Sequence, residues 1–226
     1  MFTESLSLGW QVSLVGIWLG SIILLAESLN RLARIPAEIS RKIVHIGTGN
    51  VILLAWWLHI PMWIGVSASV VAGVIALLSY KYHLLPSVDG VGRHSLGTFF
   101  YAVTMGILIA WFWSIQQPAY AVIGILVMTW GDGLAAVIGE RWGKHRYEVW
   151  GMKKSWEGTT TMFIVSFFIC SLILLIIQGN IWQTWLIALL VGVICTTMET
   201  ISKFGIDNLT VPFSAATVSF YLNYWW

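Results

Sequence analysis

The sequence predicts an all-α, polytopic membrane protein whose seven or eight transmembrane helices form one bundle. Three observations lead to this class. The 226 residues are 58% hydrophobic and only 10% charged, with 15 Trp, which is far outside the range of water-soluble globular proteins. Long apolar runs recur along the whole chain. The basic residues between these runs fall in alternate loops, as they do in proteins that cross a bilayer repeatedly.

The apolar runs have the length of transmembrane helices. A helix needs about 20 mainly apolar residues to cross a hydrocarbon core about 30 Å thick. The runs lack the alternation of barrel strands, so helices are favoured as the spanning elements. The last run is short and ends in aromatic residues typical of a membrane interface. The eight runs cover residues 8 to 26, 43 to 60, 62 to 79, 95 to 113, 118 to 139, 159 to 178, 181 to 198 and 211 to 226.

All twelve Lys and Arg residues lie in alternate loops, and the connections between those loops have none. The basic loops are segments 27 to 42, 80 to 94, 140 to 158 and 199 to 210. By the positive-inside rule these loops are expected to be cytoplasmic, with both termini on the opposite side. Eight crossings satisfy this pattern.

Other classes of protein are disfavoured. The net charge of +2 and the dispersed basic residues give no indication of nucleic-acid binding. Cys170 and Cys195 lie in apolar runs without CxxC spacing, so they are expected to pack rather than form a disulfide or a zinc site. Glu4, and no basic residue, precedes the first run, so no cleaved signal is expected. Without internal repeats or linkers, residues 1–226 are interpreted as one integral membrane domain.

Asp132 lies near the end of the fifth run, between Gly131 and Gly133. An Asp at the centre of a span costs about 3 kcal/mol on insertion scales, so it marks a candidate functional site. The alternative is a structural ion pair near the interface. The flanking glycines are expected to let a hydrated cation or a phosphate approach the backbone.

Further polar residues fall at the same predicted depth. Arg41 and His45 have the i, i+4 spacing that places them on one helix face. Ser155 precedes the sixth run, where it could cap a helix whose N-terminus would attract anions. Glu199, Lys203 and Asp207 recur every four residues, so a continuous helix would align them in one stripe. Pro212 would then suit a helix start or break.

Carboxylates, ammonium and guanidinium groups without a cluster of soft ligands favour magnesium and phosphate chemistry. Phosphoryl transfer needs a divalent ion, cations that hold the developing charge, and a carboxylate near the attacking hydroxyl. Ser95, His45 and Asp132 could also form a hydrolase triad on paper. The sequence contains no GxSxG nucleophile elbow to support that alternative.

Five motifs occur in order between about residues 40 and 215. They are Arg41-Lys42-x-x-His45, Arg93-x-Ser95-x-Gly97-Thr98, Gly131-Asp132-x-x-Ala135 with Gly139 and Gly143-Lys144, Lys154-Ser155-x-Glu157-Gly158, and Asp207-Asn208-Leu209-Thr210-x-Pro212. As a series they resemble the polyprenol kinase family, which includes dolichol kinase, CTP-dependent diacylglycerol kinase and phytol kinase. That family is related to phosphatidate cytidylyltransferases. The short chain most resembles the phytol kinase branch, whose members are associated with salvage of phytol toward tocopherol.

The resemblance implies transfer of the γ-phosphoryl group of CTP, assisted by Mg²⁺, to the hydroxyl of a membrane isoprenoid alcohol. It implies catalytic roles for Asp132, His45 and Asp207, with either Asp132 or His45 as the base. Asp132, Asp207 and Glu199 would be the metal ligands. The nucleotide-binding and phosphate-binding residues would be Arg41, Lys42, Arg93, Ser95, Lys144, Lys153, Lys154, Ser155, Lys203 and Asn208.

Two alternative functions stay open at this point. The first is a CTP:phosphatidate cytidylyltransferase that makes CDP-diacylglycerol, because the segments around Lys154 and Glu199 also resemble motifs of that family. The chain departs from that family at Asp207-Asn208-Leu209-Thr210, where the family has a longer glycine- and aspartate-rich signature. The second is a non-enzymatic lipid transporter or lipid-binding protein, although the paired broken helices of many transporters are not visible.

Overall fold

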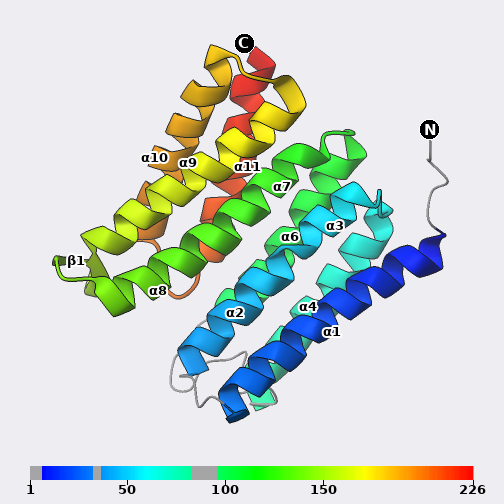
Figure 1. Cartoon of the computed structure of the whole chain (residues 1–226), viewed down its shortest axis with the longest axis horizontal. Helices are drawn as coiled ribbons and strands as arrows, with labels where there is room; N and C mark the ends of the chain where they lie inside the picture. Colours follow the sequence, from blue (N-terminus) through cyan, green and yellow to red (C-terminus); the bar gives the residue numbers. More distant parts are fainter. Residues whose placement is uncertain (1–6, 33–36, 83–95, 226) are drawn as a thin grey trace.

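A computed structural model of the chain describes residues 7–32, 37–82 and 96–225. Helices that run roughly along one common direction form most of the described structure, as Figure 1 shows. The predicted all-α, polytopic class is therefore confirmed.

Most of the helices agree with the apolar runs. In chain order the helices are α1 (Leu8–Leu32), α2 (Ala37–Gly49), α3 (Val51–Trp57), α4 (Met62–Tyr82), α6 (Gly97–Ser114), α7 (Pro118–Leu126), the π-helix η1 (Val127–Asp132), α8 (Gly133–Trp142), α9 (Trp156–Gln178), α10 (Trp182–Ile201) and α11 (Asp207–Trp225).

Six stretches within the described residues are long and apolar enough to cross a membrane: Leu8–Leu29, Met62–Tyr82, Gly97–Ser114, Pro118–Trp142, Trp156–Gln178 and Trp182–Ile201. The second and eighth runs are helical but are not among these six. The second run is divided at Asn50 into α2 and α3. The eighth run begins earlier than expected, since α11 starts at Asp207 and contains Pro212 within the helix. The total of seven or eight crossings stays a prediction.

The two ends of the bundle differ in what they carry. The end of α8, the start of α2 and the turn between α10 and α11 lie at one end, and the start of α1 and the end of α11 lie at the other (Figure 1). The basic loops that the structure describes therefore share one end, in agreement with the alternation in the sequence. Between the two ends the helices form an apolar belt, in which Val70, Phe168 and Val193 are at least half exposed.

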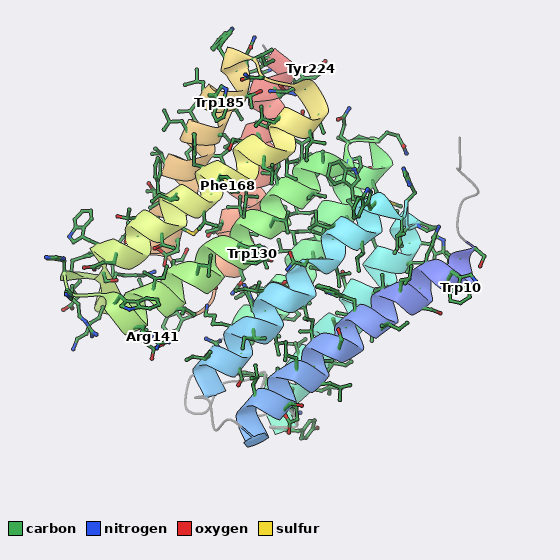
Figure 2. The ribbon with its side chains drawn as sticks, viewed as in Figure 1. Trp10, Trp130, Arg141, Phe168, Trp185 and Tyr224 are labelled. Carbon is green, nitrogen blue, oxygen red and sulfur yellow. The ribbon has the colours of Figure 1, made fainter. Side chains whose placement is uncertain are left out.

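Large apolar side chains cover the outside of that belt, as Figure 2 shows for Trp10, Phe168 and Trp185. Trp10 is 65% exposed and Phe168 is 63% exposed. Apolar exposure on this scale is unfavourable in water and is expected for helices that face lipid.

The core of the bundle is built around α7. Every residue from Ala119 to Leu126 is buried, as expected for a helix that is apolar on all sides and surrounded by other helices. Gly124 lets α11 approach closely, because a Cβ atom there would lie 2.5 Å from the carbonyl oxygen of Pro212. The chain continues from α7 into η1 and α8, so the most buried helix leads directly to Asp132.

One small β-hairpin interrupts the helical pattern. Strands β1 (Arg146–Val149) and β2 (Met152–Ser155) are antiparallel, with Tyr147 opposite Lys154. The two turn residues, Trp150 and Gly151, have φ values of 50° and 79°, and positive φ at both positions is typical of the type I′ turn. This hairpin was not expected from the sequence, which has no Asn-Gly or Asp-Gly signal here.

Replacing Gly124 with Ala is expected to destabilise the bundle, because the new Cβ would press on the backbone of α11. Overpacking of this kind costs about 1–3 kcal/mol, against a gain in helix propensity of about 1 kcal/mol at most. Thermal unfolding in detergent micelles should show a lower Tm. Gly16→Ala on α1 is the control, because no atom lies within 4 Å of its added Cβ. An equal Tm for both variants would contradict the close approach.

Candidate functional site

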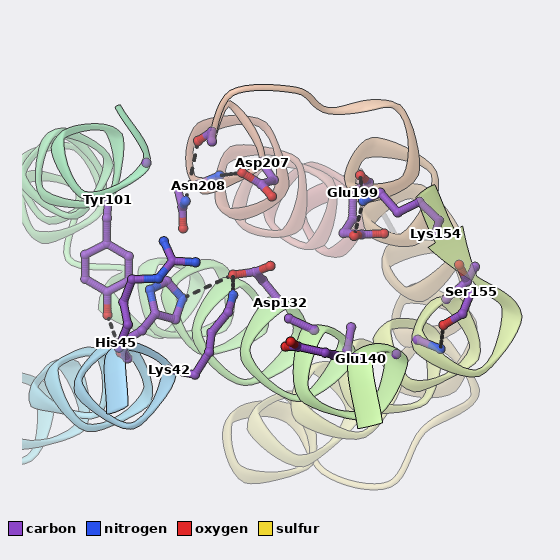
Figure 3. A pocket seen from close by; sticks show the side chains of 18 of the residues that line it. Lys42, His45, Tyr101, Asp132, Glu140, Lys154, Ser155, Glu199, Asp207 and Asn208 are labelled. Carbon is purple, nitrogen blue, oxygen red and sulfur yellow. Dashed lines mark hydrogen bonds and ion pairs between the residues drawn. The ribbon is translucent and has the colours of Figure 1, made fainter. Parts of the chain in front are cut away.

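A polar pocket of about 530 Å³ lies at the end of the bundle that carries the basic loops. Its walls come from α2, α6, η1 with α8, the hairpin with the start of α9, α10 and α11. Figure 3 shows the side chains of most of the residues that line it. Among them are ten of the residues selected from the sequence: Arg41, Lys42, His45, Asp132, Lys153, Lys154, Ser155, Glu199, Asp207 and Asn208.

Asp132 is held on one wall by two residues of α2. The Lys42 Nζ atom donates to the Asp132 Oδ2 atom at 2.8 Å, and the side chains of these residues are only 10% and 14% exposed. The Nε2 atom of His45 lies 3.7 Å from the same oxygen and has no hydrogen-bond partner among the described residues. Asp132 therefore forms an ion pair and also lines the candidate site, although the two had been considered as alternatives.

The backbone that carries Asp132 is irregular. Residues Val127–Asp132 form a π-helical segment between two α-helices, and such segments inside α-helices are frequent at functional sites. The extra residue per turn changes the direction in which the following side chains point.

The glycines beside Asp132 have a different role from the one expected. A Cβ at Gly131 would lie 2.7 Å from the Sδ atom of Met162, and one at Gly133 would lie 2.7 Å from the Cγ1 atom of Ile46. Both glycines face neighbouring helices. Because these glycines have no side chain, η1 can pack closely against α9 and α8 can pack closely against α2. The expectation that they expose the backbone to a ligand is corrected accordingly.

The hairpin forms a second wall of the pocket. Lys154 donates through Nζ to the Glu199 carbonyl oxygen at 2.9 Å and also forms an ion pair with the Glu199 carboxylate. Ser155 follows directly and caps α9, accepting a hydrogen bond from the Gly158 N–H at 3.2 Å. The predicted capping role of Ser155 is therefore confirmed. The N-terminus of α9 adds the positive end of a helix dipole to this wall.

The third wall is the start of α11, where Asp207 and Asn208 line the pocket (Figure 3). The predicted stripe of Glu199, Lys203 and Asp207 is wrong, because α10 ends at Ile201 and α11 begins only at Asp207. Phe204 and Gly205 have positive φ values of 56° and 84°, and they lie in the turn that separates α10 from α11. Glu199 and Asp207 still reach one pocket, but from two different helices.

Asn208 carries an acceptor that has no partner. Its side chain is 9% exposed, and its buried Oδ1 atom has no hydrogen-bond partner among the described residues. In addition, Pro212 lies four residues later and has no N–H with which to bond the Asn208 carbonyl. Buried acceptors of this kind are costly unless a ligand or an ion satisfies them.

Sequence reasoning missed Tyr101 as part of this site. Its hydroxyl donates to the His45 carbonyl oxygen at 3.0 Å and its ring lies 4.6 Å from the imidazole, centroid to centroid. Tyr101 thus fixes His45 from the side of α6. The available signal was its position three residues after Thr98 on the predicted fourth run, which places both residues on one helix face. Glu140 and Arg146 also line the pocket and had not been selected.

Four of the predicted residues are not found in the pocket lining. Arg93 and Ser95 lie outside the described residues. Lys144 is exposed, and its main-chain N–H donates to the Glu157 carboxylate at 3.1 Å. Lys203 donates through Nζ to the Trp150 carbonyl oxygen, so it ties the turn between α10 and α11 to the hairpin.

The donor set of the pocket fits a hard divalent cation. Asp132 and Asp207 lie on facing walls in Figure 3, and the unpartnered Oδ1 atom of Asn208 lies between α6 and the start of α11. Oxygen donors of this type suit Mg²⁺, which keeps several waters and takes few protein ligands. Within ranges 7–32, 37–82 and 96–225, no three His, Cys, Asp or Glu residues are close enough to form a complete metal cage.

Fold and site together define a polytopic membrane protein with a charged, oxygen-rich pocket at one end of an apolar helix bundle. A phytol kinase of Synechocystis sp. is 50% identical over 215 residues, which cover 95% of this chain and 92% of that relative. Phytol kinase 1, chloroplastic, of Arabidopsis thaliana is 29% identical over 90% of this chain and 72% of its own length. A probable chloroplastic phytol kinase of Triticum aestivum is 28% identical over 89% and 73%.

The chain belongs to the phytol kinase family. No family model matches it, and no solved structure matches it. The phytol kinase relatives confirm the predicted enzyme class, a kinase that acts on an alcohol. The relatives with which it aligns are kinases, in contrast to the cytidylyltransferase and transporter alternatives.

Removing Lys42 is expected to destabilise the fold strongly, because Lys42→Met leaves the Asp132 carboxylate buried without its partner. Loss of one member of a buried pair costs about 3–5 kcal/mol. The double variant Lys42→Met/Asp132→Asn should recover part of that loss. Chemical unfolding in micelles measures the coupling between the two sites. If Lys42→Met and the double variant were equally stable, the pair would not be what holds α2 to η1. Lys81→Met, at an exposed position of α4, should have little effect.

Proposed function

We propose that the protein transfers the γ-phosphoryl group of CTP to the hydroxyl of phytol or a related isoprenoid alcohol dissolved in the membrane. The observation that carries this proposal is the 50% identity, over nearly the whole chain, to a protein named phytol kinase. The pocket supports it, because acidic and basic side chains from five parts of the chain converge at one end of an apolar bundle.

The basic groups of the pocket are the proposed site for the triphosphate. Arg41 and Lys42 lie on the α2 side, whereas Lys153 and Lys154 lie on the hairpin side. Cations on two walls can hold a triphosphate between them and stabilise the charge that develops during phosphoryl transfer. The N-terminus of α9, capped by Ser155, is a further anion-binding element beside the lysines.

We assign magnesium binding to Asp132 and Asp207, with the Asn208 side-chain oxygen as an additional polar partner. In phosphoryl transfer the metal neutralises charge on the phosphate oxygens. Glu199 is bound to Lys154 in this structure, so we place it as a group that positions the hairpin lysine. Within the pocket, either the Asp132 carboxylate or the Nε2 atom of His45 can accept the proton of the attacking hydroxyl.

The location of the site explains how two very different substrates could meet. The nucleotide reaches the pocket from water at the end of the bundle, and the alcohol reaches it from the bilayer. Following the positive-inside rule, we place this end at the cytoplasmic face and the termini on the opposite side. Sealed vesicles of known orientation test this placement, because only nucleotide on the cytoplasmic side should support the reaction.

The direct test incubates purified protein in lipid vesicles with phytol and CTP labelled at the γ position. Label is expected in phytyl phosphate. Release of label as pyrophosphate in the presence of phosphatidate would instead indicate a cytidylyltransferase. Parallel reactions with ATP, GTP and UTP establish the donor.

Asp132→Asn is expected to abolish transfer while the protein stays folded, because the amide keeps an acceptor for Lys42 but loses the charge that binds the metal. Glu148→Gln is the matched control, since Glu148 is an exposed carboxylate of β1 outside the pocket lining. Full transfer activity in Asp132→Asn would refute the assigned role.

Removal of divalent cations should stop the reaction. Treatment with EDTA is expected to reduce transfer to background, and addition of Mg²⁺ should restore it. Asp207→Asn should raise the Mg²⁺ concentration needed for half-maximal activity, because one oxygen ligand loses its charge. Unchanged activity in EDTA would exclude the proposed metal.

A further inference from the structure

An apolar groove of about 360 Å³ runs between α4 and α6, away from the residues already assigned. Its lining consists almost entirely of aliphatic side chains, with Phe99 at one end and Ser69 as the polar exception. Val70 and Val74, on the α4 side, are 61% and 51% exposed. Because both helices are candidate membrane spans, the groove lies within the predicted apolar thickness of the bilayer.

The groove and the polar pocket lie on adjacent faces of the same helix. At the first turn of α6, Thr98 lines the pocket and Phe99 lines the groove. One turn later Tyr101 lines the pocket and Ala102 lines the groove. The start of α6 therefore forms a thin wall between a charged site and an apolar channel, and Gly97 leaves that wall without a side chain at its edge.

We propose that this groove binds the isoprenoid tail of the alcohol acceptor, so that its hydroxyl passes over the first turn of α6 into the pocket. This inference rests on the function proposed above and adds the site for the acceptor tail. An alcohol with a long apolar tail needs an apolar surface for the tail and polar partners for the hydroxyl. The first turns of α6 supply both within one residue of each other.

The dimensions favour a hydrocarbon chain over another helix as the occupant. The lining extends along α4 from Val66 to Leu77, a length of about 16 Å at the rise of an α-helix. Its floor is shallow because α4 and α6 are in close contact, with a Cβ at Gly106 only 3.0 Å from the Cβ of Ser69. A helix about 10 Å across would not enter such a space, whereas a branched chain of carbon atoms would.

Two valines on α4 provide a matched pair for the test. Val70 lines the groove, and its neighbour Val71 does not, although it is 57% exposed on the same helix. Val70→Trp should fill the middle of the groove, and Val71→Trp adds the same bulk on another lipid-facing surface. With phytol as acceptor, kcat/KM is expected to fall about tenfold in Val70→Trp, within the range of discrimination by hydrophobic pockets. It should stay unchanged in Val71→Trp.

Two further readouts separate a tail site from a general defect. With a five-carbon prenyl alcohol, which is too short to reach Val70, both variants should match the wild type, and the KM for nucleotide should not change. Equal activity of both tryptophan variants on phytol would overturn the proposal, as would equal losses on the long and short alcohols.

A binding experiment tests the groove independently of turnover. An isoprenoid alcohol with a photoreactive group in its tail should label residues 66–77 and 99–110, and excess phytol should compete with it whereas phosphatidylcholine should not. Val70→Trp should reduce this labelling. Labelling confined to other residues would contradict the tail site. Labelling that phosphatidylcholine removes equally well would show that the groove binds bulk lipid. Specific labelling without phosphoryl transfer would contradict the proposed function but support the groove.

Discussion

A carboxylate inside an apolar helix bundle has to be paired, and the ion pair between Lys42 and Asp132 meets this requirement at the base of the pocket. It joins α2 to η1, the continuation of the most buried helix. A second pair, Lys154 with Glu199, joins the hairpin to α10 in the same way. Four of the charged groups that line the pocket are thus arranged as two neutral couples, and an isolated buried charge would be very costly.

These pairs stabilise the charged groups of the pocket and keep them available to a charged ligand. In a magnesium–nucleotide complex the carboxylate of a pair would turn toward the metal and the ammonium group toward a phosphate. Such an exchange replaces one set of charge-assisted hydrogen bonds with another of similar strength. The desolvation cost of the groups has already been met in folding, so binding does not have to supply it again.

Much of the fold could be predicted from the sequence because hydrophobicity and length are local signals. The apolar runs became helices, and the alternation of basic loops placed the polar residues at one end of the bundle. The convergence of Asp132, Asp207 and the lysines near position 154 into one pocket followed from that alternation. The resemblance of the motif series added the chemistry, which composition alone could not supply.

The features that were missed depend on backbone geometry without a local signal. The hairpin turns at Trp150 and Gly151 rather than at a standard turn dipeptide. The break between α10 and α11 contains one glycine. The four-residue spacing of charges across it had favoured a continuous helix. Which lysine meets which carboxylate is a tertiary contact, so the pairing of Lys154 with Glu199 could not be derived from spacing. Lys203, chosen for its charge, instead binds the backbone of the hairpin turn.

Helix α6 separates two environments that the proposed reaction has to connect. Its first turns contact the charged pocket with Thr98 and Tyr101 and the apolar groove with Phe99 and Ala102. Tyr101 also holds His45 from this side. The same short segment would therefore orient a catalytic side chain and delimit the path of a lipid substrate.

The π-helical segment that ends at Asp132 makes the register of one short stretch decisive. Each residue advances a helix by about 100° around its axis, given 3.6 residues per turn. A regular α-helix over the same residues would therefore change the direction of the Asp132 carboxylate relative to Lys42, even with every side chain kept. At this point the type of helix, as well as the chemical identity of its residues, determines whether the site can form.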